Sequence, residues 1–350
     1  MDHQPNDLGA AATVAPVSAP PSTMRAVQHL RYGDAGVLQL AERDVPRPGR
    51  GQVLVRVRAA AIDRGTWHVM RGEPWLARLA FGLRRPSRVP VPGRDVAGTV
   101  VAVGDGVTRF AVGDEVYGTA LGSLAEYAVA PVVRLAPAPS GVAAATLAPI
   151  PVSGLTAWQA LRDGGRLQPG HRVLVIGASG GVGSFAVQLA HACGAEVVGV
   201  CSASKADAVR ALGADRVIDR RVPAWWRPLL DADERFDVVL DGGGRLPVRT
   251  LRRLVAPRGA LVLVGAEGGG PVTGGMGRQL RAVLRGLVSR QRIVMLVARE
   301  SGADLEGLNG FVERGQLSPY VDRVVDLDGV VDAMRALERG EVTGKIVVVP

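Results

Sequence analysis

Cysteine, lysine and aromatic residues are all scarce in this chain of 350 residues. Its two cysteines cannot supply a disulfide scaffold, nor a zinc site built mainly from thiolates, which needs about three or four. Apolar runs stay well short of the roughly 20 residues that span a bilayer, so no membrane-spanning helix is expected. With 47% hydrophobic and 21% charged residues, the composition is typical of a globular protein with room for about two domains.

The net charge of +9 comes almost entirely from arginine, because Lys205 and Lys345 are the only lysines among 42 basic residues. Arginine is joined by abundant alanine, glycine and valine, which indicates a general composition bias. A basic charge is in any case an argument about solubility and steering rather than about a fold or a specific partner. We therefore expect no nucleic-acid partner.

Residues 1–23 are rich in alanine, proline and serine and show no hydrophobic periodicity. A secretory signal needs a basic start and a long apolar run. Here Asp2 and Asp7 stand near the start, and prolines interrupt the remainder. We interpret this stretch as a disordered tail, and expect a cytoplasmic protein with no membrane partner.

The rest of the chain shows two different patterns of predicted secondary structure. Residues 24–135 are dense in short β signals, such as the alternating run at 52–62, and predict a mostly antiparallel β module. From about residue 150, helical segments alternate with nearly continuous apolar strands, the first at 172–178. This alternation predicts an α/β unit with a parallel sheet covered on both faces. Two helices and a final strand at 344–350 follow.

A glycine-rich loop at 177–183 joins the first of these strands to a helix predicted at 184–194. Gly177 and Gly180 allow a tight turn and close approach to a pyrophosphate, and Gly183 lets the helix pack on the strand. The helix N-terminus then offers N–H groups to phosphates. We predict a dinucleotide site that includes the loop; the alternative is an ordinary glycine-rich βα turn. The loop positions assigned to the cofactor are Gly177, Ser179, Gly180, Gly181, Val182 and Gly183.

The second strand of the α/β unit lacks the acid that usually holds the ribose 2′-hydroxyl of NAD. It ends instead in Ser202 and, shortly after, Lys205, whose hydroxyl and ammonium suit a 2′-phosphate. Arg220 and Arg221, after the third strand, could join them. NADPH is therefore favoured over NADH. The alternative for Lys205 is a solvated residue at a helix start.

Several motifs together resemble the medium-chain dehydrogenase/reductase superfamily, in its zinc-free quinone oxidoreductase branch. They are VPGRDVAGTVVAVGDGVTRFAVGDEVYG (89–118), SLAEYAVAP (123–131), SGLTAWQAL (153–161), GASGGVGSFAVQLA (177–190) and the closing GKIVVVP. The resemblance implies a GroES-like β domain, residues 24–150 and 299–350, and a Rossmann-type doubly wound parallel-sheet domain, residues 151–298. It places the active cleft between the two domains.

The same resemblance implies that zinc is absent. Zinc-dependent relatives carry a cysteine where this chain has Asp63, and a His-Glu pair where it has Arg94 and Asp95. Arginine has no lone pair to offer a metal. His68 is a candidate proton donor, or else a loop histidine. Asp63 stands where zinc-free relatives usually have asparagine; it could bind the substrate or the nicotinamide ribose, or simply fix its loop.

The remaining cofactor candidates come from segments expected to border the nicotinamide. Thr156 resembles the family's threonine there, although its role could be helix packing. Four residues end successive strands, where they could equally serve loop geometry: Asp241, Gly242, Val264 and Gly265. Lys345 in the last strand completes the set. Arginines 278, 281 and 285 fall near one helical face, which we interpret as solvated, or else as an entrance for an acidic substrate or a membrane contact.

These observations predict an NADPH-dependent, zinc-independent oxidoreductase that transfers hydride to a quinone or an α,β-unsaturated carbonyl. Such acceptors take hydride directly, whereas a simple alcohol is hard to oxidise without a Lewis acid. A 2-enoyl thioester reductase and an alcohol or aldehyde dehydrogenase remain alternatives. So does a non-catalytic NADPH-binding protein of the RNA-binding or crystallin-like kind. The resemblance also implies a homo-oligomer, a dimer.

Overall fold

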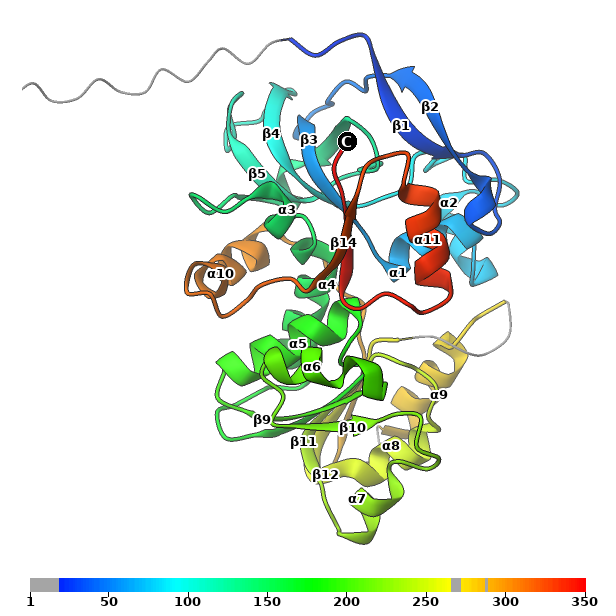
Figure 1. Cartoon of the computed structure of the whole chain (residues 1–350), viewed down its shortest axis with the longest axis vertical. Helices are drawn as coiled ribbons and strands as arrows, with labels where there is room; N and C mark the ends of the chain where they lie inside the picture. The colour runs from blue at the N-terminus through cyan, green and yellow to red at the C-terminus, as the bar shows by residue number, and fades with distance from the viewer. Residues whose placement is uncertain (1–18, 266–271, 287–288) are drawn as a thin grey trace, which may run out of the picture.

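The computed structural model describes residues 19–265, 272–286 and 289–350 (Figure 1). Most of the predicted tail, residues 1–18, lies outside the described residues. The chain forms two lobes stacked along its longest axis, with helices α4 (Ile150–Gln159) and α5 (Gly181–Ala192) where they meet. We call them the β lobe and the α/β lobe.

The β lobe is built on a seven-stranded sheet. Strand β3 lies at its centre. It pairs antiparallel with β4 along one edge and with β6 and β15 along the other, so most of this long strand has a neighbour on both sides. The strands of this lobe are β1 (Thr23–His29), β2 (Leu38–Asp44), β3 (Gln52–Ile62), β4 (Asp95–Val103), β5 (Glu115–Thr119), β6 (Tyr127–Pro131), β7 (Leu135–Pro137), β14 (Val321–Val325) and β15 (Lys345–Val348); β1 and β2 form a separate hairpin.

Short helices flank this sheet: α1 (Arg64–Arg71), α2 (Arg78–Phe81), α3 (Ala144–Leu147), α10 (Gly302–Glu313) and α11 (Val330–Glu338). The β-module prediction missed α1. Its start is nevertheless encoded locally, because Asp63 caps it by accepting from the Thr66 N–H at 2.7 Å. Its end is encoded by Gly72, which is left-handed at φ 62.

The α/β lobe contains a six-stranded, all-parallel sheet of order β10-β9-β8-β11-β12-β13. Numbered from its first strand, this is the 3-2-1-4-5-6 order of dinucleotide-binding folds. Its strands are β8 (Arg172–Ile176), β9 (Glu196–Cys201), β10 (Arg216–Asp219), β11 (Phe236–Asp241), β12 (Val255–Leu263) and β13 (Arg292–Met295). Its further helices are α6 (Ala206–Ala211), α7 (Arg227–Asp231), α8 (Val248–Leu254) and α9 (Met276–Gly286).

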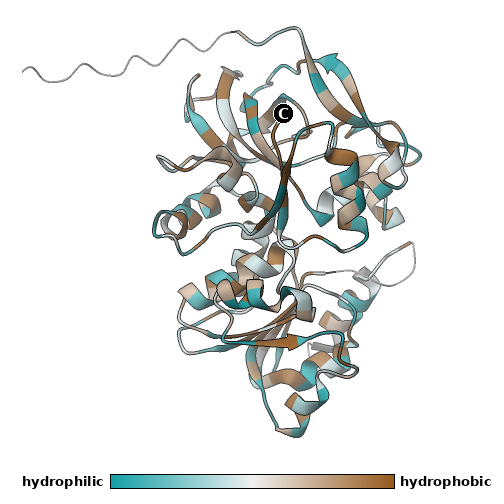
Figure 2. Cartoon of the chain, in the orientation of Figure 1, coloured by the Kyte–Doolittle hydropathy of each residue, from teal (hydrophilic) through white to brown (hydrophobic). Residues whose placement is uncertain are grey.

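Both faces of this sheet are covered, as the apolar strands predicted. Alternate residues of β8 enter different cores: Val173 and Val175 share a cluster with Phe185 of α5, whereas Leu174 packs with Leu251 of α8. Figure 2 shows the resulting hydrophobic strands of the α/β lobe. Helix α5 begins at Gly181 rather than at the predicted residue 184, because the glycines of the loop already form its first turn.

The end of the chain returns to the β lobe. Val347 of β15 pairs with Ala61 of β3, so the last strand completes the sheet that the first half began. This return brings Gly344 and Lys345 next to the start of α5. The exact domain boundaries given above stay predictions.

Candidate functional site

The glycine-rich loop follows β8 at the carboxyl edge of the parallel sheet. Gly177 is left-handed at φ 88, which disfavours any other residue. A Cβ at Gly183 would lie 2.1 Å from the Gly177 carbonyl oxygen, so the crossing of loop and helix requires glycine there. The two glycines therefore allow the backbone to turn tightly below a space that an approaching phosphate could use.

The loop leads into the positive end of α5. Gly180 is the N-cap and supplies no side-chain cap, and the first N–H groups of a helix have no acceptor within it. The β lobe reaches this point, because the Gly344 N–H donates to the Ser179 carbonyl at 2.8 Å. A Cβ at Gly181 would lie 3.2 Å from Cδ of Lys345. The helix terminus thus lies against the other lobe, and Val182 in its first turn is partly buried.

Neighbouring strand ends border the same edge. The Asp241 carbonyl accepts from the N–H groups of Val264 and Gly265 at 3.1 and 3.0 Å. A Cβ at Gly265 would lie 2.1 Å from the Gly242 carbonyl oxygen, so the loops after β11 and β12 touch. These contacts give the four residues the loop-geometry role, and they place them beside the glycine-rich loop.

Asp241 is also one half of an ion pair. Its carboxylate is fully buried and accepts from Arg278 at 3.0 Å and from the Gly244 N–H at 2.9 Å. The interpretation of Arg278 as a solvated residue is therefore wrong, because a buried carboxylate draws the guanidinium inward. Arg281 of the same helix is exposed, and the side chain of Arg285 lies outside the described residues.

A buried cluster of charges lies on the β-lobe side of the cofactor loop. The ammonium of Lys345, 1% exposed, donates to Asp95 at 2.7 Å and to the Ser153 hydroxyl at 3.2 Å. The second oxygen of Asp63 lies 3.8 Å from the same ammonium. Strand β15, strand β4, helix α4 and the start of α1 supply these residues. We call Asp63, Asp95, Ser153 and Lys345 the buried charge cluster.

The two carboxylates of this cluster differ in their surroundings. Burial raises the pKa of Asp95 to about 7, against the opposing effect of Lys345 and in concert with the negative charge of Asp63. Asp95 also accepts from the Val152 N–H at 2.7 Å. One oxygen of Asp63 caps α1, while the other is buried and makes no hydrogen bond. Buried polar atoms seldom lack a partner, so this oxygen marks the position as special.

At the other end of the loop, the predicted 2′-phosphate residues are only partly brought together. Ser202 is buried directly after β9, and Arg220 follows β10 with its N–H on the Cys201 carbonyl at 2.7 Å. The Lys205 ammonium instead donates to the carbonyls of Val342 and Gly340 at 2.6 and 3.3 Å. Lys205 is therefore not a solvated residue; in this structure it ties the two lobes together.

Two further candidates lie apart from the charge cluster. The Nδ1 atom of His68 lies 2.9 Å from the Glu73 carbonyl, and its ring meets Trp67 edge-on. Thr156 donates its hydroxyl to the Val152 carbonyl of its own helix at 2.6 Å, which is a packing role.

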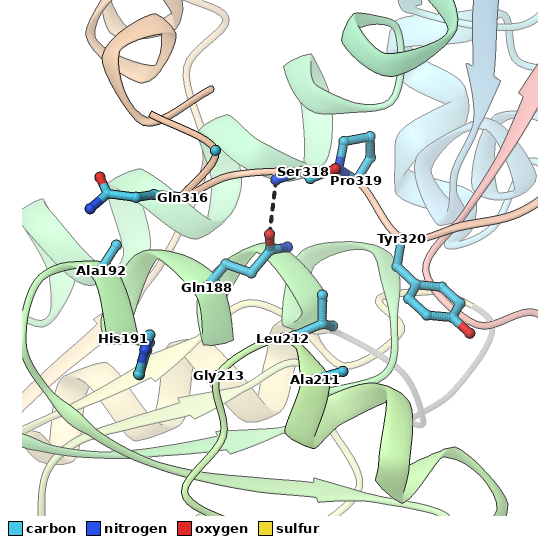
Figure 3. A pocket seen from close by; sticks show the side chains of 11 residues that line it. Gln188, His191, Ala192, Ala211, Leu212, Gly213, Gln316, Ser318, Pro319 and Tyr320 are labelled. Carbon is cyan, nitrogen blue, oxygen red and sulfur yellow. Dashed lines mark hydrogen bonds between the residues drawn. The ribbon is translucent and has the colours of Figure 1, made fainter. Parts of the chain in front are cut away.

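A separate depression of 620 Å³ lies between α5, α6 and the segment 315–320, which joins α10 to β14 (Figure 3). Gln188 crosses its floor and accepts from the Ser318 N–H at 2.9 Å, while His191 and Tyr320 stand on opposite sides. It borders the second half of α5, whereas the buried charge cluster lies near the first residue of that helix. Sequence reasoning assigned nothing to it.

Comparison with known proteins identifies the family to which this architecture belongs. Residues 49–140 match the alcohol dehydrogenase GroES-like domain, and residues 212–348 match a family described as zinc-binding dehydrogenase. The chloroplast envelope quinone oxidoreductase homolog of Arabidopsis thaliana is 31% identical over 93% of this chain and 98% of its own. The chain belongs to the quinone oxidoreductase-like branch of the medium-chain dehydrogenase/reductase superfamily. Its predicted fold class is thereby confirmed.

Two other matches extend this result. An NADPH-dependent alkenal/one oxidoreductase of Arabidopsis thaliana is 33% identical over 97% of this chain and 83% of its own. The solved structure of the quinone oxidoreductase from Coxiella burnetii superposes with a TM-score of 0.82 at 26% identity, covering 94% of this chain and 99% of that one. The similarity thus spans both lobes.

Within the family fold, sequence reasoning missed part of the site. Asp95 was noted only as a replacement for a zinc ligand, and Ser153 not at all. Both residues stand in recognised motifs, PGRDVAG and SGLTAW. The motifs mark the two positions as notable but do not show that both contact Lys345. The ion pairs of Glu300 with Arg94 and Arg134 were also unforeseen. These ion pairs connect the segment that follows β13, the last strand of the α/β lobe, to the β lobe.

Proposed function

We propose that the protein is an NADPH-dependent, zinc-independent reductase of quinones or α,β-unsaturated carbonyls. The observation that carries this proposal is the glycine cradle at the start of α5, which opens toward the buried charge cluster of the other lobe. Relatives named quinone oxidoreductase and alkenal/one oxidoreductase, similar over nearly the whole chain, support the choice of acceptor.

The cofactor fits the residues at this edge. The N-terminus of α5 would hold the pyrophosphate, since its first N–H groups have no acceptor within the helix. The ammonium of Lys345 could contribute only by leaving Asp95 and Ser153. Ser202 and Arg220 would hold the 2′-phosphate through a hydroxyl and a guanidinium. When bound, NADPH supplies the hydride for the reduction. Lys205 could bind the 2′-phosphate only if its ammonium left the carbonyls of Val342 and Gly340. We therefore expect Arg220 to contribute more than Lys205 to the preference for NADPH over NADH.

A zinc ion does not fit the corresponding region of this chain. The Lys345 ammonium lies 2.7 Å from Asp95 and 3.8 Å from Asp63, so a cation already occupies the position between the two carboxylates. A dication there would be repelled, and it would have to displace a buried lysine. No group of three histidine, cysteine, aspartate or glutamate side chains arranged to hold a metal occurs in the described part of the chain.

The reduction adds a hydride to one carbon and a proton elsewhere, and the protein's own share is to position the acceptor and supply the proton. His68 is the proposed donor. The Glu73 carbonyl accepts the Nδ1 proton of this ring and fixes its orientation. The transferred proton would therefore leave Nε2 of the doubly protonated ring, which becomes neutral and keeps its Nδ1 proton. Asp63 caps α1 and thereby fixes where that helix begins, which in turn determines the position of His68 on it. We assign Asp63 a positioning role.

The test is stopped-flow loss of nicotinamide absorbance with quinones, enones and 2-enoyl thioesters, using NADPH and NADH in parallel. We expect quinones or enones to be turned over with NADPH. Arg220→Ala should weaken NADPH binding by about tenfold and leave NADH binding unchanged. Turnover of enoyl thioesters alone would favour the reductase alternative, and binding without any turnover would favour a non-catalytic protein.

Metal dependence is tested separately by elemental analysis and by chelation. A zinc content near zero, with activity unchanged after chelation, is expected; one zinc per chain would contradict the proposal. None of the described helices is long and apolar enough to cross a membrane. The cytoplasmic location and the dimer stay predictions.

A further inference from the structure

The segment that follows α1 exposes large apolar side chains next to arginines. Trp75 and Leu76 in a short 3₁₀ helix are 50% and 45% exposed, and Leu79 and Leu83 in and after α2 are 62% and 67% exposed. Single exposed apolar residues are ordinary, whereas a contiguous group marks an interaction site or an aggregation liability. We call residues 74–88 the arginine-leucine patch.

The charge of this patch has one sign. Residues 74–88 contain four arginines and no acidic residue. Arg84 and Arg85 are exposed beside Leu83. The other two brace the segment: Arg88 donates to the Leu79 carbonyl at 2.9 Å, and Arg78 donates to that of Gly72 at the same distance. The apolar side chains are therefore presented by an ordered backbone with cationic groups around them.

The α/β lobe extends this surface. The Leu76 N–H donates to the Val272 carbonyl at 3.2 Å, which joins the patch to the segment before α9. Val272 is 48% exposed, and Leu280 and Arg281 of α9 are exposed as well. Figure 1 shows α2 and α9 on the same side of the molecule, one in each lobe. Exposed apolar residues and arginines of the two lobes thus lie on one side of the molecule and are joined at the contact between Leu76 and Val272.

We propose that the arginine-leucine patch docks the protein on an anionic phospholipid surface. Tryptophan and leucine side chains flanked by arginines are the combination that lies in the headgroup region, with the apolar part entering the acyl boundary. Clustered arginines without acids would be repelled by a cationic surface and gain little from a neutral one, so charge complementarity selects anionic headgroups. This interaction is peripheral and needs no spanning helix, and it departs from our expectation of no membrane partner.

The docking proposal is independent of the proposed activity but gives it a route for substrate. Docking through the patch would hold the protein at the layer in which apolar acceptors dissolve. The two ideas fail separately, because docking is measured as binding to vesicles and the activity as turnover of a water-soluble quinone.

The experiment is co-sedimentation of the full chain with vesicles of phosphatidylcholine, with and without phosphatidylserine. We expect sedimentation with phosphatidylserine vesicles only, and release at high salt. Arg84→Gln and Arg85→Gln should each weaken binding by about fivefold. The matched control is Arg249→Gln with Arg253→Gln, two exposed arginines of α8, which should leave binding unchanged.

The apolar part is tested by Leu83→Glu against Val133→Glu. Both residues are 67% exposed, so burial does not distinguish them. Loss of vesicle binding in the first variant alone supports the proposal; equal loss in both overturns it. Failure of the parent to sediment also overturns it. A third outcome overturns the proposal as well. If the parent does not bind vesicles and Leu83→Glu has a lower oligomeric mass by light scattering, the patch is an interface with a second copy of the chain. Unchanged unfolding midpoints verify that each variant is folded.

Discussion

Replacing Lys345 with methionine tests the buried charge cluster directly. The ammonium is 1% exposed and its partner Asp95 is fully buried. Methionine keeps an unbranched apolar stem but removes the charge, which leaves Asp95 with the Val152 N–H and facing a second carboxylate, Asp63. Removing one partner of a buried ion pair costs about 3–5 kcal/mol when the other partner stays charged. Asp95 can take up a proton instead, so we expect a smaller loss, of about 1–2 kcal/mol, in the free energy of unfolding near pH 8.

The loss should depend on pH. Burial raises the pKa of Asp95 from 3.8 to about 7. This carboxyl therefore contributes stability in full below pH 3.8, and loses it as the pH rises through about 7. Without the lysine that pKa rises further. The deficit of Lys345→Met should be small near about pH 5.5, where the carboxyl is protonated in both folded proteins. Above about pH 7, where only the parent carboxyl ionises, it should grow by up to roughly 1.4 kcal/mol per pH unit.

The assay is urea unfolding followed by tryptophan fluorescence, without cofactor, at both pH values. Asp95→Asn added to Lys345→Met removes the ionisable carboxyl and should recover most of the loss at pH 8, because an amide is buried at lower cost than an unpaired charge. An equal deficit at both pH values, or a double variant no more stable than Lys345→Met, would refute the assignment of the cost to an unpaired Asp95.

Two further predictions concern single positions. Gly183→Ala places a Cβ 2.1 Å from the Gly177 carbonyl oxygen, and should lower stability by about 1–3 kcal/mol and weaken NADPH binding in a fluorescence titration. Gly307→Ala, where a Cβ meets nothing within 4 Å, is its control; equal effects would contradict the cradle. Burial lowers the pKa of His29 from 6.5, so its share of stability is present above pH 6.5 and lost as the pH falls below it. His29→Gln should reduce that acid loss by about 1 kcal/mol per pH unit in urea unfolding, whereas exposed His191→Gln should not.

Local patterns predicted much of the fold. The nearly continuous apolar strands indicated a parallel sheet with both faces covered, and β8 shows why: its alternate side chains enter two different cores. The glycine spacing at 177–183 indicated a phosphate loop because each glycine answers a steric demand of its immediate surroundings. The start of α1 was missed, although the Asp63 cap is written in the sequence, because a single cap carries little weight beside a dense β pattern.

The candidate site was less accessible to such reasoning. Lys205 was predicted at a phosphate and lies instead on carbonyls of the other lobe, 137 positions away in the case of Val342. Arg278 was predicted to be solvated, because helical periodicity shows which residues share a face of a helix. It does not show that a buried acid of another element, Asp241, packs against that face. In both cases the chemistry of the side chain was judged correctly and its partner was not.

The sequence by itself determined the family, the two kinds of domain and the phosphate loop, because these depend on residues close together in the chain. Only the tertiary structure decided that Lys345 lies between Asp95 and Asp63, since the lysine and Asp95 are 250 positions apart. The arginine-leucine patch likewise became visible only once the apolar residues of segment 74–88 were seen to remain exposed. Periodicity and composition report local preference, whereas burial and charge pairing depend on which distant segments the fold brings into contact.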